Sequence, residues 1–599
     1  MAVLSKALWA LTSLAIGASA ASFPPTPQGL SVVQSLKFPG VSISYKETTI
    51  CETTEGVKAY SGYVHLPPAP EQNRNYTSSI WFWFFEARNS SESAPLSVWL
   101  QGGPGVPSAT AAVSENGPCK VLADSWNTEN NPWAWNDKVN MLYIDQPIQV
   151  GFSYDTLVNG TLDEVATPFN YTPADFSEGL PETNLTYLAG TFASQNFGNS
   201  WNTTIAGAPV MWEFMQAFFQ DFPEYNSSTN SLSFWGESYG GHYIPTYANY
   251  FAEQNARLAE SNCTEEAEIA LGIDTVGLVN ACIDNIQMET YPEFAYNNTY
   301  GIQAINSSVY ASALEAVPVC RNLSATCVEL ADSKDPQGFG NVPEVNKACF
   351  TAYNYCFKNL HDSYNASLNF FDVTAAKYPL HYSPSKVPAG YFNNATIQQA
   401  LGVPLNFTGN SVPISTGFMM TGDFIRTHGI ANLRSLLTKG TKVALMYGDR
   451  DYQCNWLGGE AISNALSSTA SGFETAKYSE IQTNGSYVGG LVRQAGNLSF
   501  SRVFQAGHEV PYYQPETAYQ IFNRVMFGAD VATGLDSVEE YVSGGFESAW
   551  SDSEIPEPEG KTHCYLWDVL ETCTPAEVAV LASGKAVMED HVLIGQQEE

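Results

Sequence analysis

A short β-prone run followed at once by a G-x-S-x-G pentapeptide constrains this chain more than any other feature. Residues 231–235 read Ser-Leu-Ser-Phe-Trp, and residues 236–243 read Gly-Glu-Ser-Tyr-Gly-Gly-His-Tyr. A strand ending in this pattern is typical of a nucleophile elbow, where the turn into a helix leaves no room for a Cβ at the flanking glycines. The pattern predicts that Ser238 projects from the carboxyl end of a buried strand. In a chain with 46 glycines it is also compatible with an ordinary turn.

Several other short apolar runs end in Gly, Asp or Pro, as buried parallel strands do. They cover residues 96–100, 140–144, 442–447 and 502–504. Helix-capable stretches lie between some of these runs, such as residues 208–219 and the segment after Ser238. Strands alternating with helices, with reactive residues at strand ends, predict an open, doubly wound, mostly parallel α/β sheet.

The chain contains no low-complexity linker or internal repeat, so we expect one large catalytic domain over residues 21–550. The stretch from about 263 to 389 is rich in Cys, Asn and Tyr and has no clear buried-strand run. We interpret the region from about 255 to 390 as an inserted cap of helices and loops, stapled by disulfides. Residues 551–599 form an acidic C-terminal extension.

The first twenty residues combine a lysine, a short apolar stretch and the small residues Ala18-Ser19-Ala20, which predicts a cleaved secretory signal peptide. We therefore expect secretion to the outside of the cell, with a vacuole as the alternative. No other run approaches the length of a membrane helix. N-linked glycans are expected at some of the N-x-Ser/Thr sequons, which include Asn75, Asn89, Asn159, Asn170, Asn184, Asn202, Asn226, Asn297, Asn365, Asn406 and Asn497.

Charge and cysteine content narrow the function classes further. A formal net charge of −35 argues against nucleic acid or anionic membranes as partners and is consistent with service at acidic pH. In an oxidising compartment the 11 cysteines predict disulfides, and no CxxC or HxxxH pair suggests a metal site or a cofactor. We expect Cys51–Cys119 and Cys564–Cys573, with six more pairing among themselves: Cys263, Cys282, Cys320, Cys327, Cys349 and Cys356.

The partners that a serine nucleophile requires occur downstream in the order found in α/β-hydrolases, acid before histidine. Asp451 follows the apolar run 442–447, and His508 follows the run around 503–504. Both belong to loops after predicted strands, where this sheet architecture places catalytic groups. A single histidine of this kind is more often structural, but the order Ser238, Asp451, His508 favours a catalytic triad.

Further motifs carry a resemblance to a known family. They are Trp99-Leu-Gln-Gly-Gly-Pro-Gly105, Glu115-Asn-Gly-Pro118, Asn131-Pro-Trp-Ala-Trp135, Ile144-Asp-Gln-Pro147 and Gly151-Phe-Ser153. With the three catalytic segments they make the chain, from about residue 40 to 530, resemble the serine carboxypeptidases that include carboxypeptidase Y, and most of all the secreted fungal members. The resemblance implies an α/β-hydrolase fold and an enzyme that releases C-terminal amino acids from peptides and proteins.

The same resemblance assigns roles to individual residues. Ser238 is then the nucleophile, His508 the base and later the acid, and Asp451 the group that orients His508. The backbone N–H groups of Gly103 and Tyr239 form the oxyanion hole, which agrees with the usual position of such donors. Cys454 corresponds to a free buried thiol, so we expect it to remain unpaired.

In this family a carboxyl pair binds the α-carboxylate of the substrate, and Glu115 and Glu237 correspond to it. Because two adjacent carboxyls cannot both ionise cheaply, one stays protonated and donates a hydrogen bond, which predicts faster peptide hydrolysis in acid. Gln101 and Gly102 complete this binding site. Gln101 stands where the family usually has Asn, and its extra methylene predicts that the amide overshoots by about an ångström.

Two residues are candidates for the specificity pocket. Phe424 is expected to line the pocket for the penultimate side chain, or else to be a core aromatic. Glu509 resembles the glutamate of relatives that accept basic leaving residues, or else is an exposed loop residue. Because of Gln101, a hydrolase or acyltransferase that acts on non-peptide esters is a second hypothesis, and a catalytically silent secreted glycoprotein is a third.

Overall fold

The computed structural model describes residues 23–89, 93–167, 171–226, 229–260, 267–365, 367–376, 387–426, 428–556 and 563–597. The predicted signal peptide, the sequon residue Asn170 and Cys263 lie outside these ranges.

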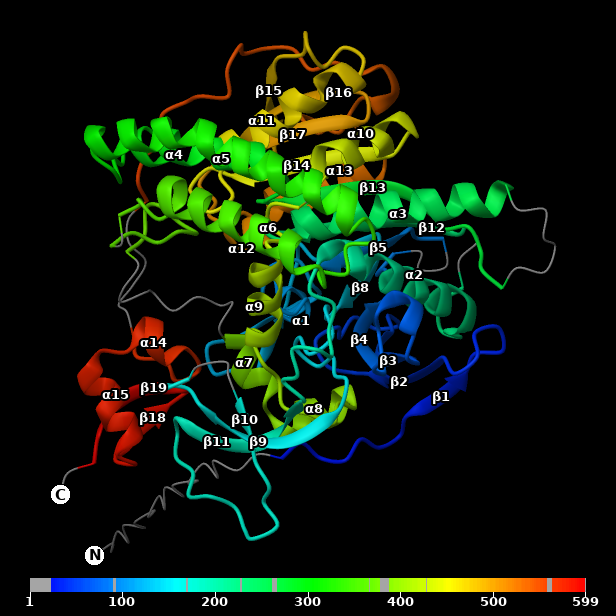
Figure 1. Ribbon diagram of the computed structural model, residues 1–599, viewed down its shortest axis with the longest axis vertical. Coiled ribbons are helices and arrows are strands. Elements are labelled where there is room, and N and C mark those ends of the chain that lie inside the picture. Colours follow the sequence, from blue (N-terminus) through cyan, green and yellow to red (C-terminus); the bar gives the residue numbers. More distant parts are fainter. Residues whose placement is uncertain are drawn as a thin grey trace, which may run out of the picture.

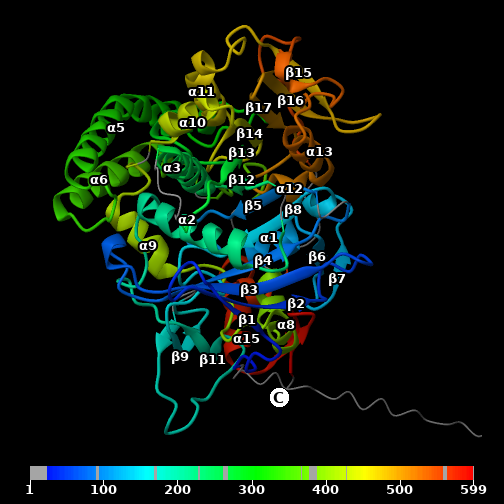
Figure 2. The same cartoon turned by 90° about the vertical axis from the view of Figure 1, so that its right-hand side faces the viewer.

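A large sheet runs through the described part of the chain (Figures 1 and 2). Its 12 strands lie in the order β1 (Ser31–Gln34), β2 (Ser42–Thr48), β3 (Ala59–Leu66), β4 (Ser78–Phe85), β8 (Asn140–Ile144), β5 (Leu96–Leu100), β12 (Ser231–Glu237), β13 (Gly272–Val279), β14 (Lys442–Gly448), β17 (Leu498–Val503), β16 (Val488–Ala495) and β15 (Tyr478–Gln482). The strands from β8 to β17 in this order are parallel, and those on either side are antiparallel. The predicted doubly wound, mostly parallel α/β sheet is confirmed.

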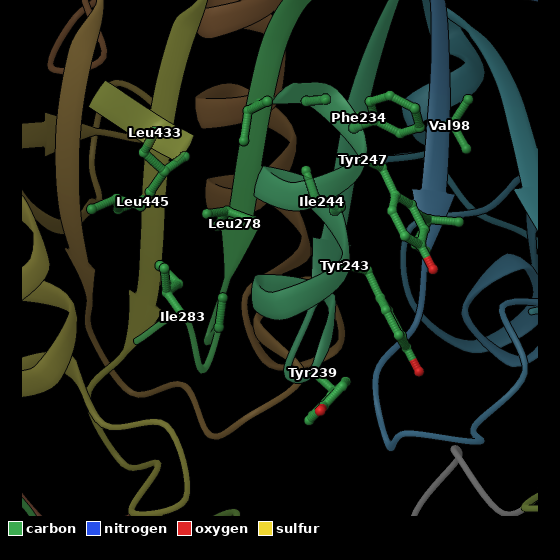
Figure 3. Close-up of a cluster of buried hydrophobic side chains, with 14 of the residues drawn as sticks. Val98, Phe234, Tyr239, Tyr243, Ile244, Tyr247, Leu278, Ile283, Leu433 and Leu445 are labelled. Atoms are coloured by element: carbon green, nitrogen blue, oxygen red, sulfur yellow. The ribbon is translucent and has the colours of Figure 1, made fainter. Parts of the chain in front are cut away.

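Alternating side chains of the central strands face two separate cores, because successive residues of a strand point to opposite faces. In β12, Phe234 joins one core and Trp235 the other. The first core is covered by helices α2 (Thr204–Asp221), α3 (Gly240–Glu260), α10 (Gly429–Thr438) and α11 (Trp456–Leu466). Ile244 of α3 and Leu278 of β13 both belong to it (Figure 3). Helices α1 (Ala109–Ser114) and α13 (Pro515–Met526) cover the second core.

The region expected to be a cap contains one strand that belongs to the main sheet. Strand β13 lies at the centre of the sheet between β12 and β14, so the prediction that residues 263–389 hold no buried strand is wrong. The strand escapes a hydrophobicity search because Asp274, Thr275 and Gly277 interrupt its apolar run. Gly277 is required sterically, since a Cβ there would lie 2.1 Å from the indole of Trp235.

The cap itself begins after β13. It consists of the 3-10 turn η3 (Asn285–Thr290), helices α4 (Tyr291–Tyr296), α5 (Ser307–Lys334) and α6 (Pro343–Cys356), and the turn η4 (Phe357–His361), followed by loops. Disulfides Cys320–Cys356 and Cys327–Cys349 join α5 to α6. A helical insertion stapled by disulfides is therefore present, and it begins later along the chain than predicted.

Two small additions complete the fold. A three-stranded sheet is formed by β9 (Leu157–Asp163), β10 (Tyr171–Pro173) and β11 (Tyr187–Ala193). Residues 563–597, which we call the C-terminal module, contain η7 (Leu566–Asp568), α14 (Val569–Thr572), α15 (Pro575–Ala582), β18 (Ala586–Glu589) and β19 (Val592–Gln596). The module lies beside the β9–β11 sheet (Figure 1), so most of the predicted acidic extension is folded.

The described residues contain five disulfides, and they correct the predicted pairing at one site. Cys51–Cys119 and Cys564–Cys573 are confirmed. The prediction of a free Cys454 is wrong, because Cys454 pairs with Cys282 across a Cα–Cα distance of 5.3 Å. Cys282 follows β13 and Cys454 follows β14. Since these strands are parallel neighbours, their loops meet at the same edge of the sheet.

Candidate active site

Ser238 occupies the turn between β12 and α3, as the G-x-S-x-G pattern predicts. Its φ of 59° is in the left-handed region that few non-glycine residues adopt, and its N–H donates to Val279 O at 3.1 Å. A Cβ on Gly236 would lie 2.2 Å from Leu100 O, and one on Gly240 would lie 2.9 Å from the same oxygen. Both glycines are therefore required by the close approach of β5, and the ordinary-turn alternative is excluded.

The histidine and the acid predicted to serve Ser238 are in direct contact. His508 Nδ1 lies 2.7 Å from Asp451 Oδ2, and the two residues come from the loops after β17 and β14. Asp451 is fully buried, and its oxygens also accept hydrogen bonds from the N–H groups of Gln453 and Cys454. Since a carboxylate accepts, His508 carries its proton on Nδ1 and has Nε2 available for a second partner. Ser238 and His508 line the same cavity.

Sequence reasoning missed Asn280, which holds the acid in place. Its Nδ2 donates to Asp451 Oδ2 at 2.8 Å, and its Oδ1 accepts from Gly448 N at 2.7 Å. Asn280 follows β13 directly and has a φ of 33°. Recognition of β13 as a central strand would have placed Asn280 beside Asp451, because the ends of parallel neighbouring strands meet at one sheet edge.

A segment at the end of the cap joins the two loops that carry Asp451 and His508. We call residues 369–374 the strap. Phe370 O accepts from the N–H groups of Tyr452 and Gln453 at 3.0 Å, and Phe371 O accepts from His508 N at 2.9 Å. The ring of Phe371 lies 4.7 Å from the imidazole of His508, centroid to centroid. The strap was also missed, because its contacts are long-range and its backbone is irregular.

The predicted oxyanion-hole residues, Gly103 and Tyr239, both line the cavity of Ser238, and the neighbouring Gly102 contacts the elbow. A Cβ on Gly102 would lie 2.5 Å from Tyr239 N and 2.6 Å from Ser238 Cβ, so only glycine permits this approach. Gly103 follows with a φ of 108°. The structure thus brings the glycine loop after β5 against the first residue of the turn into α3, the arrangement that places two backbone donors beside a serine oxygen.

Glu115 and Glu237 form a buried carboxyl pair, as predicted. They are 2 % and 1 % exposed, and their side chains interact with each other. Burial raises the pKa of both groups well above the ordinary value, and the charge of Glu509 raises both further. For Glu237 the adjacent Glu115 adds to the increase. One shared proton relieves the repulsion within such a pair.

The amide of Gln101 bridges to this pair, and the overshoot toward a substrate carboxylate stays a prediction. Nε2 of Gln101 lies 2.8 Å from Glu237 Oε1 and 3.4 Å from Glu115 Oε1. On the other side, Trp99 Nε1 donates to Gln101 Oε1 at 2.7 Å, which fixes the orientation of the amide. The backbone N–H of Gln101 donates to Ser108 Oγ at 3.0 Å. These contacts direct the longer side chain toward the carboxyls.

Both specificity candidates line the cavity that contains Ser238. Phe424 packs edge-on against Tyr239 at 4.6 Å and lies 5.3 Å from Tyr353 and 5.6 Å from Phe357, so it contributes to an aromatic wall. Tyr353 and Phe357 belong to the cap and were not predicted. Glu509 is partly buried, and its charge raises the pKa values of Glu115 and Glu237. It is therefore more than an exposed loop residue.

The cavity has a volume of about 1430 Å³ and is larger than a dipeptide needs. The parts of the chain that line it include the catalytic loops, the cap with its strap, the β9–β11 sheet, residues 389–410 and the C-terminal module. Among the described residues no group of three or more His, Cys, Asp or Glu side chains is arranged to hold a metal ion. Within the same ranges, no helix combines the length and apolar character needed to cross a membrane.

Comparison with known proteins identifies the family. Residues 50–528 match the family model described as serine carboxypeptidase. The chain belongs to the serine carboxypeptidase family. It is 44 % identical to carboxypeptidase S1 homolog A of Arthroderma otae over 96 % of this chain and 90 % of the relative. It is 33 % identical to carboxypeptidase S1 of Penicillium janthinellum over 80 % of this chain and 98 % of the relative.

The solved structures agree on the fold. A prohormone-processing carboxypeptidase from Saccharomyces cerevisiae superposes with a TM-score of 0.56 and 21 % identity, over 78 % of this chain and 91 % of the other. The expected family, its α/β-hydrolase fold and its serine-type carboxypeptidase activity are thereby confirmed. The C-terminal module lies beyond the residues that the family model matches, although it lines the same cavity as Ser238.

Proposed function

We propose that this serine carboxypeptidase works in acid through an acyl-enzyme and takes peptides with a free C-terminal carboxylate. The observation that carries the proposal is that one cavity joins two devices: an elbow serine with a bonded His508–Asp451 pair, and a buried carboxyl pair with raised pKa values. The first suits acyl transfer to serine. The second suits the binding of a carboxylate by a protonated acid.

In the proposed reaction, Nε2 of His508 takes the proton of Ser238 Oγ as the oxygen attacks the scissile carbonyl carbon. The resulting oxyanion is held by the N–H groups of Gly103 and Tyr239. His508 then gives the proton to the leaving nitrogen, and the C-terminal amino acid departs. Water, deprotonated by the same imidazole, hydrolyses the ester and restores Ser238. Asp451 holds the imidazole tautomer throughout and stabilises its positive charge.

The substrate carboxylate is proposed to bind between Gln101, Gly102 and the Glu115/Glu237 pair. A protonated carboxyl can donate to it, whereas a doubly ionised pair repels it. Gln101 supports this arrangement because its Nε2 contacts both glutamates. Glu509 lies near enough to raise the pKa of both carboxyls, so a basic side chain on the departing residue is expected to be favoured over an acidic one.

For location we propose delivery through the secretory pathway, to the outside of the cell or to a vacuole. The support is the leader-like sequence of residues 1–20 and the presence of five disulfides in the described residues. N-linked glycans are proposed at the exposed sequons, such as Asn226. Asn406 is a poor acceptor, because its side chain is 7 % exposed and its Nδ2 bonds to Asn393 Oδ1 at 3.3 Å.

A matched pair of substrates tests the proposal. Blocked dipeptides with a free C-terminal carboxylate and the same dipeptides as C-terminal amides are incubated in acid, and the release of the last residue is measured. We expect hydrolysis of the acids and at least a 100-fold lower kcat/KM for the amides, which is about 3 kcal/mol of lost recognition. Equal rates on both would overturn the carboxylate site. If the dipeptides with a free carboxylate are not hydrolysed although Ser238 of the same enzyme still reacts with an organophosphate, the peptidase assignment for this chain is overturned.

A further inference from the structure

The C-terminal module is firmly attached to the catalytic domain at one wall of the cavity. Tyr565 is fully buried and its hydroxyl bonds to Ser125 Oγ, which in turn donates to Val387 O at 3.0 Å. The buried residues of the module, including Cys564 and Leu581, pack against Val165 and Leu185 next to the small β9–β11 sheet. Such contacts hold the module in one position. Its inner surface is therefore a fixed wall of the active-site cavity.

That wall places two apolar side chains in the cavity and faces a wall in which apolar side chains predominate. From the module, Leu566 and Trp567 line the cavity, with Glu571 and His591 beside them. From the β9–β11 sheet and its loops, five apolar residues line the cavity with two polar ones: Leu162, Leu185, Leu188, Ala189 and Phe192, with Glu164 and Asn184. The indole of Trp567 is supported by the imidazole of His591 at 5.9 Å between ring centroids. It also packs so closely on helix α7 (Val387–Phe392) that a Cβ on Gly390 would lie 2.4 Å from Trp567 Nε1.

The proposed reaction uses only part of the cavity. The departing residue lies between the carboxyl pair and Ser238, and the residue that is acylated lies at the aromatic wall around Phe424. These two positions account for a dipeptide, whereas the cavity of about 1430 Å³ exceeds the range of about 300–1000 Å³ that holds most drug-sized ligands. Because the cavity is continuous, residues upstream of the scissile bond extend from Ser238 toward the remaining walls, at about 3.3 Å per residue.

We propose that the C-terminal module and the β9–β11 sheet form an apolar outer subsite that binds substrate residues upstream of the scissile dipeptide. This proposal rests on the proposed function, since it uses the position of the scissile bond to orient the peptide. The occupant is the substrate chain itself, because the subsite opens into the cavity of Ser238. The enzyme is then built for oligopeptides and polypeptides with apolar residues at the third or fourth position from the C-terminus. Their side chains bury Leu566 and Trp567 on one side and Leu188 on the other.

The test compares peptides that share their last two residues and differ upstream. Blocked di-, tri- and tetrapeptides carry either Leu or Ser at the added positions, and kcat/KM is measured for each. With wild-type enzyme we expect about a tenfold gain for an added Leu and little gain for an added Ser, as burial of one leucine side chain implies. Trp567→Ala is expected to lose most of the leucine gain while hydrolysing the blocked dipeptide at the wild-type rate, and Trp567→Phe to restore most of it.

Two controls keep the result interpretable. Trp550→Ala removes a tryptophan that is 37 % exposed and does not line the cavity, and it should leave the leucine gain intact. Leu188→Ser alters the opposite wall and should reproduce the loss even if Trp567→Ala destabilises the module. The proposal is overturned if both wall variants keep the wild-type dependence on upstream residues. It is also overturned if Trp567→Ala accelerates dipeptide hydrolysis without changing that dependence, because the module would then act as a lid.

A binding measurement separates this proposal from the proposed function. Titration calorimetry with Ser238→Ala and the same peptides reports affinity without turnover. Tighter binding of the leucine-extended peptides to Ser238→Ala than to the Ser238→Ala/Trp567→Ala double variant supports the subsite even where no hydrolysis is observed. Equal affinities in the two variants would overturn it, whatever the activity of the wild-type enzyme.

Discussion

The sheet-edge loops and the structures added around them contribute different kinds of residue to this cavity. The loops after β5, β12, β14 and β17 supply the elbow serine, the His508–Asp451 pair, the glycine loop and half of the carboxyl pair. The cap, the β9–β11 sheet and the C-terminal module supply walls in which apolar side chains predominate, and none of the residues of the proposed reaction. The first set is positioned by hydrogen-bonded parallel strands, and the second by disulfides and side-chain packing.

This difference shows that the residues of the proposed reaction and the residues of the cavity walls are positioned by different kinds of interaction. A reactive group must keep its place to a fraction of an ångström, which the ends of buried strands provide. An apolar wall needs only shape and position. The two regions meet at the strap, where residues of the cap contact the catalytic loops. Substitutions on either side of that boundary should therefore have distinct effects on kcat, on KM and on stability.

The largest effect is expected at the nucleophile. Ser238→Ala should lower kcat by about 10⁶-fold, as removal of a triad serine does, because no other group in the proposed reaction can form the ester. The free energy of unfolding should not fall, because replacing the serine by alanine removes no buried contact that stabilises the fold. A blocked dipeptide in acid gives the rate, and thermal unfolding gives the stability. Ser97→Ala, at a buried hydroxyl of β5 without a hydrogen-bond partner in the described structure, is the matched control and should keep full activity. An active Ser238→Ala enzyme would contradict the triad.

How far the site can be predicted from sequence follows the same division. Ser238 was predictable because an elbow is a local pattern with a steric cause. Asp451 and His508 were predictable because both follow apolar strand runs, and parallel topology brings such ends together. Asn280 was missed because polar and glycine residues hide β13. The Cys282–Cys454 bond was missed because the family resemblance implied a free thiol at Cys454. The strap, the aromatic cap wall and Trp567 depend on long-range packing of irregular segments, which has no period to detect.

The next largest effect is the dependence of catalysis on pH. Burial raises the pKa values of Glu115 and Glu237, so the folded enzyme keeps a proton that an ordinary glutamate loses at about pH 4.3. Above the raised value the pair loses its proton, and KM should rise by about tenfold for each pH unit. By linkage, the free energy of unfolding should also fall as pH rises from the ordinary toward the raised pKa, because the folded state binds more protons than the unfolded chain.

Glutamine substitution tests whether the buried pair causes this dependence. Glu237→Gln should flatten both the KM profile and the stability profile, while Glu329→Gln on the exposed surface of α5 should change neither. Steady-state kinetics and thermal unfolding across the acid range check the prediction. A wild-type KM that does not change with pH, or an unchanged slope in Glu237→Gln, would show that the pair does not control carboxylate binding.

An effect of intermediate size is expected when a disulfide at the sheet edge is compared with a disulfide in the cap. Removing Cys282–Cys454 as a double alanine variant should lower kcat by about tenfold, because Cys454 N donates to Asp451 Oδ2 and Cys282 N donates to Ser238 O. Removing Cys327–Cys349 in the cap should leave kcat unchanged. Both changes should cost about 2–5 kcal/mol of stability. Turnover and thermal unfolding of the two variants are measured together. Equal losses of kcat would mean that the cap is as closely coupled to the chemistry as the catalytic loops are.

The smallest expected effect tests the boundary itself, at Phe371 of the strap. Its ring packs on the imidazole of His508, and its carbonyl already accepts from His508 N, so the side chain alone can be removed without breaking that hydrogen bond. Phe371→Ala should lower kcat by about three- to tenfold and leave KM unchanged, because the imidazole then loses a packing partner that holds its orientation. Phe371→Leu should restore part of the rate. Phe527, which is 53 % exposed against 48 % for Phe371 and lies outside the cavity, provides the control Phe527→Ala. If Phe371→Ala changes KM and leaves kcat unchanged, the strap shapes the pocket like the rest of the cap, and the positioning of His508 belongs to the sheet-edge loops alone.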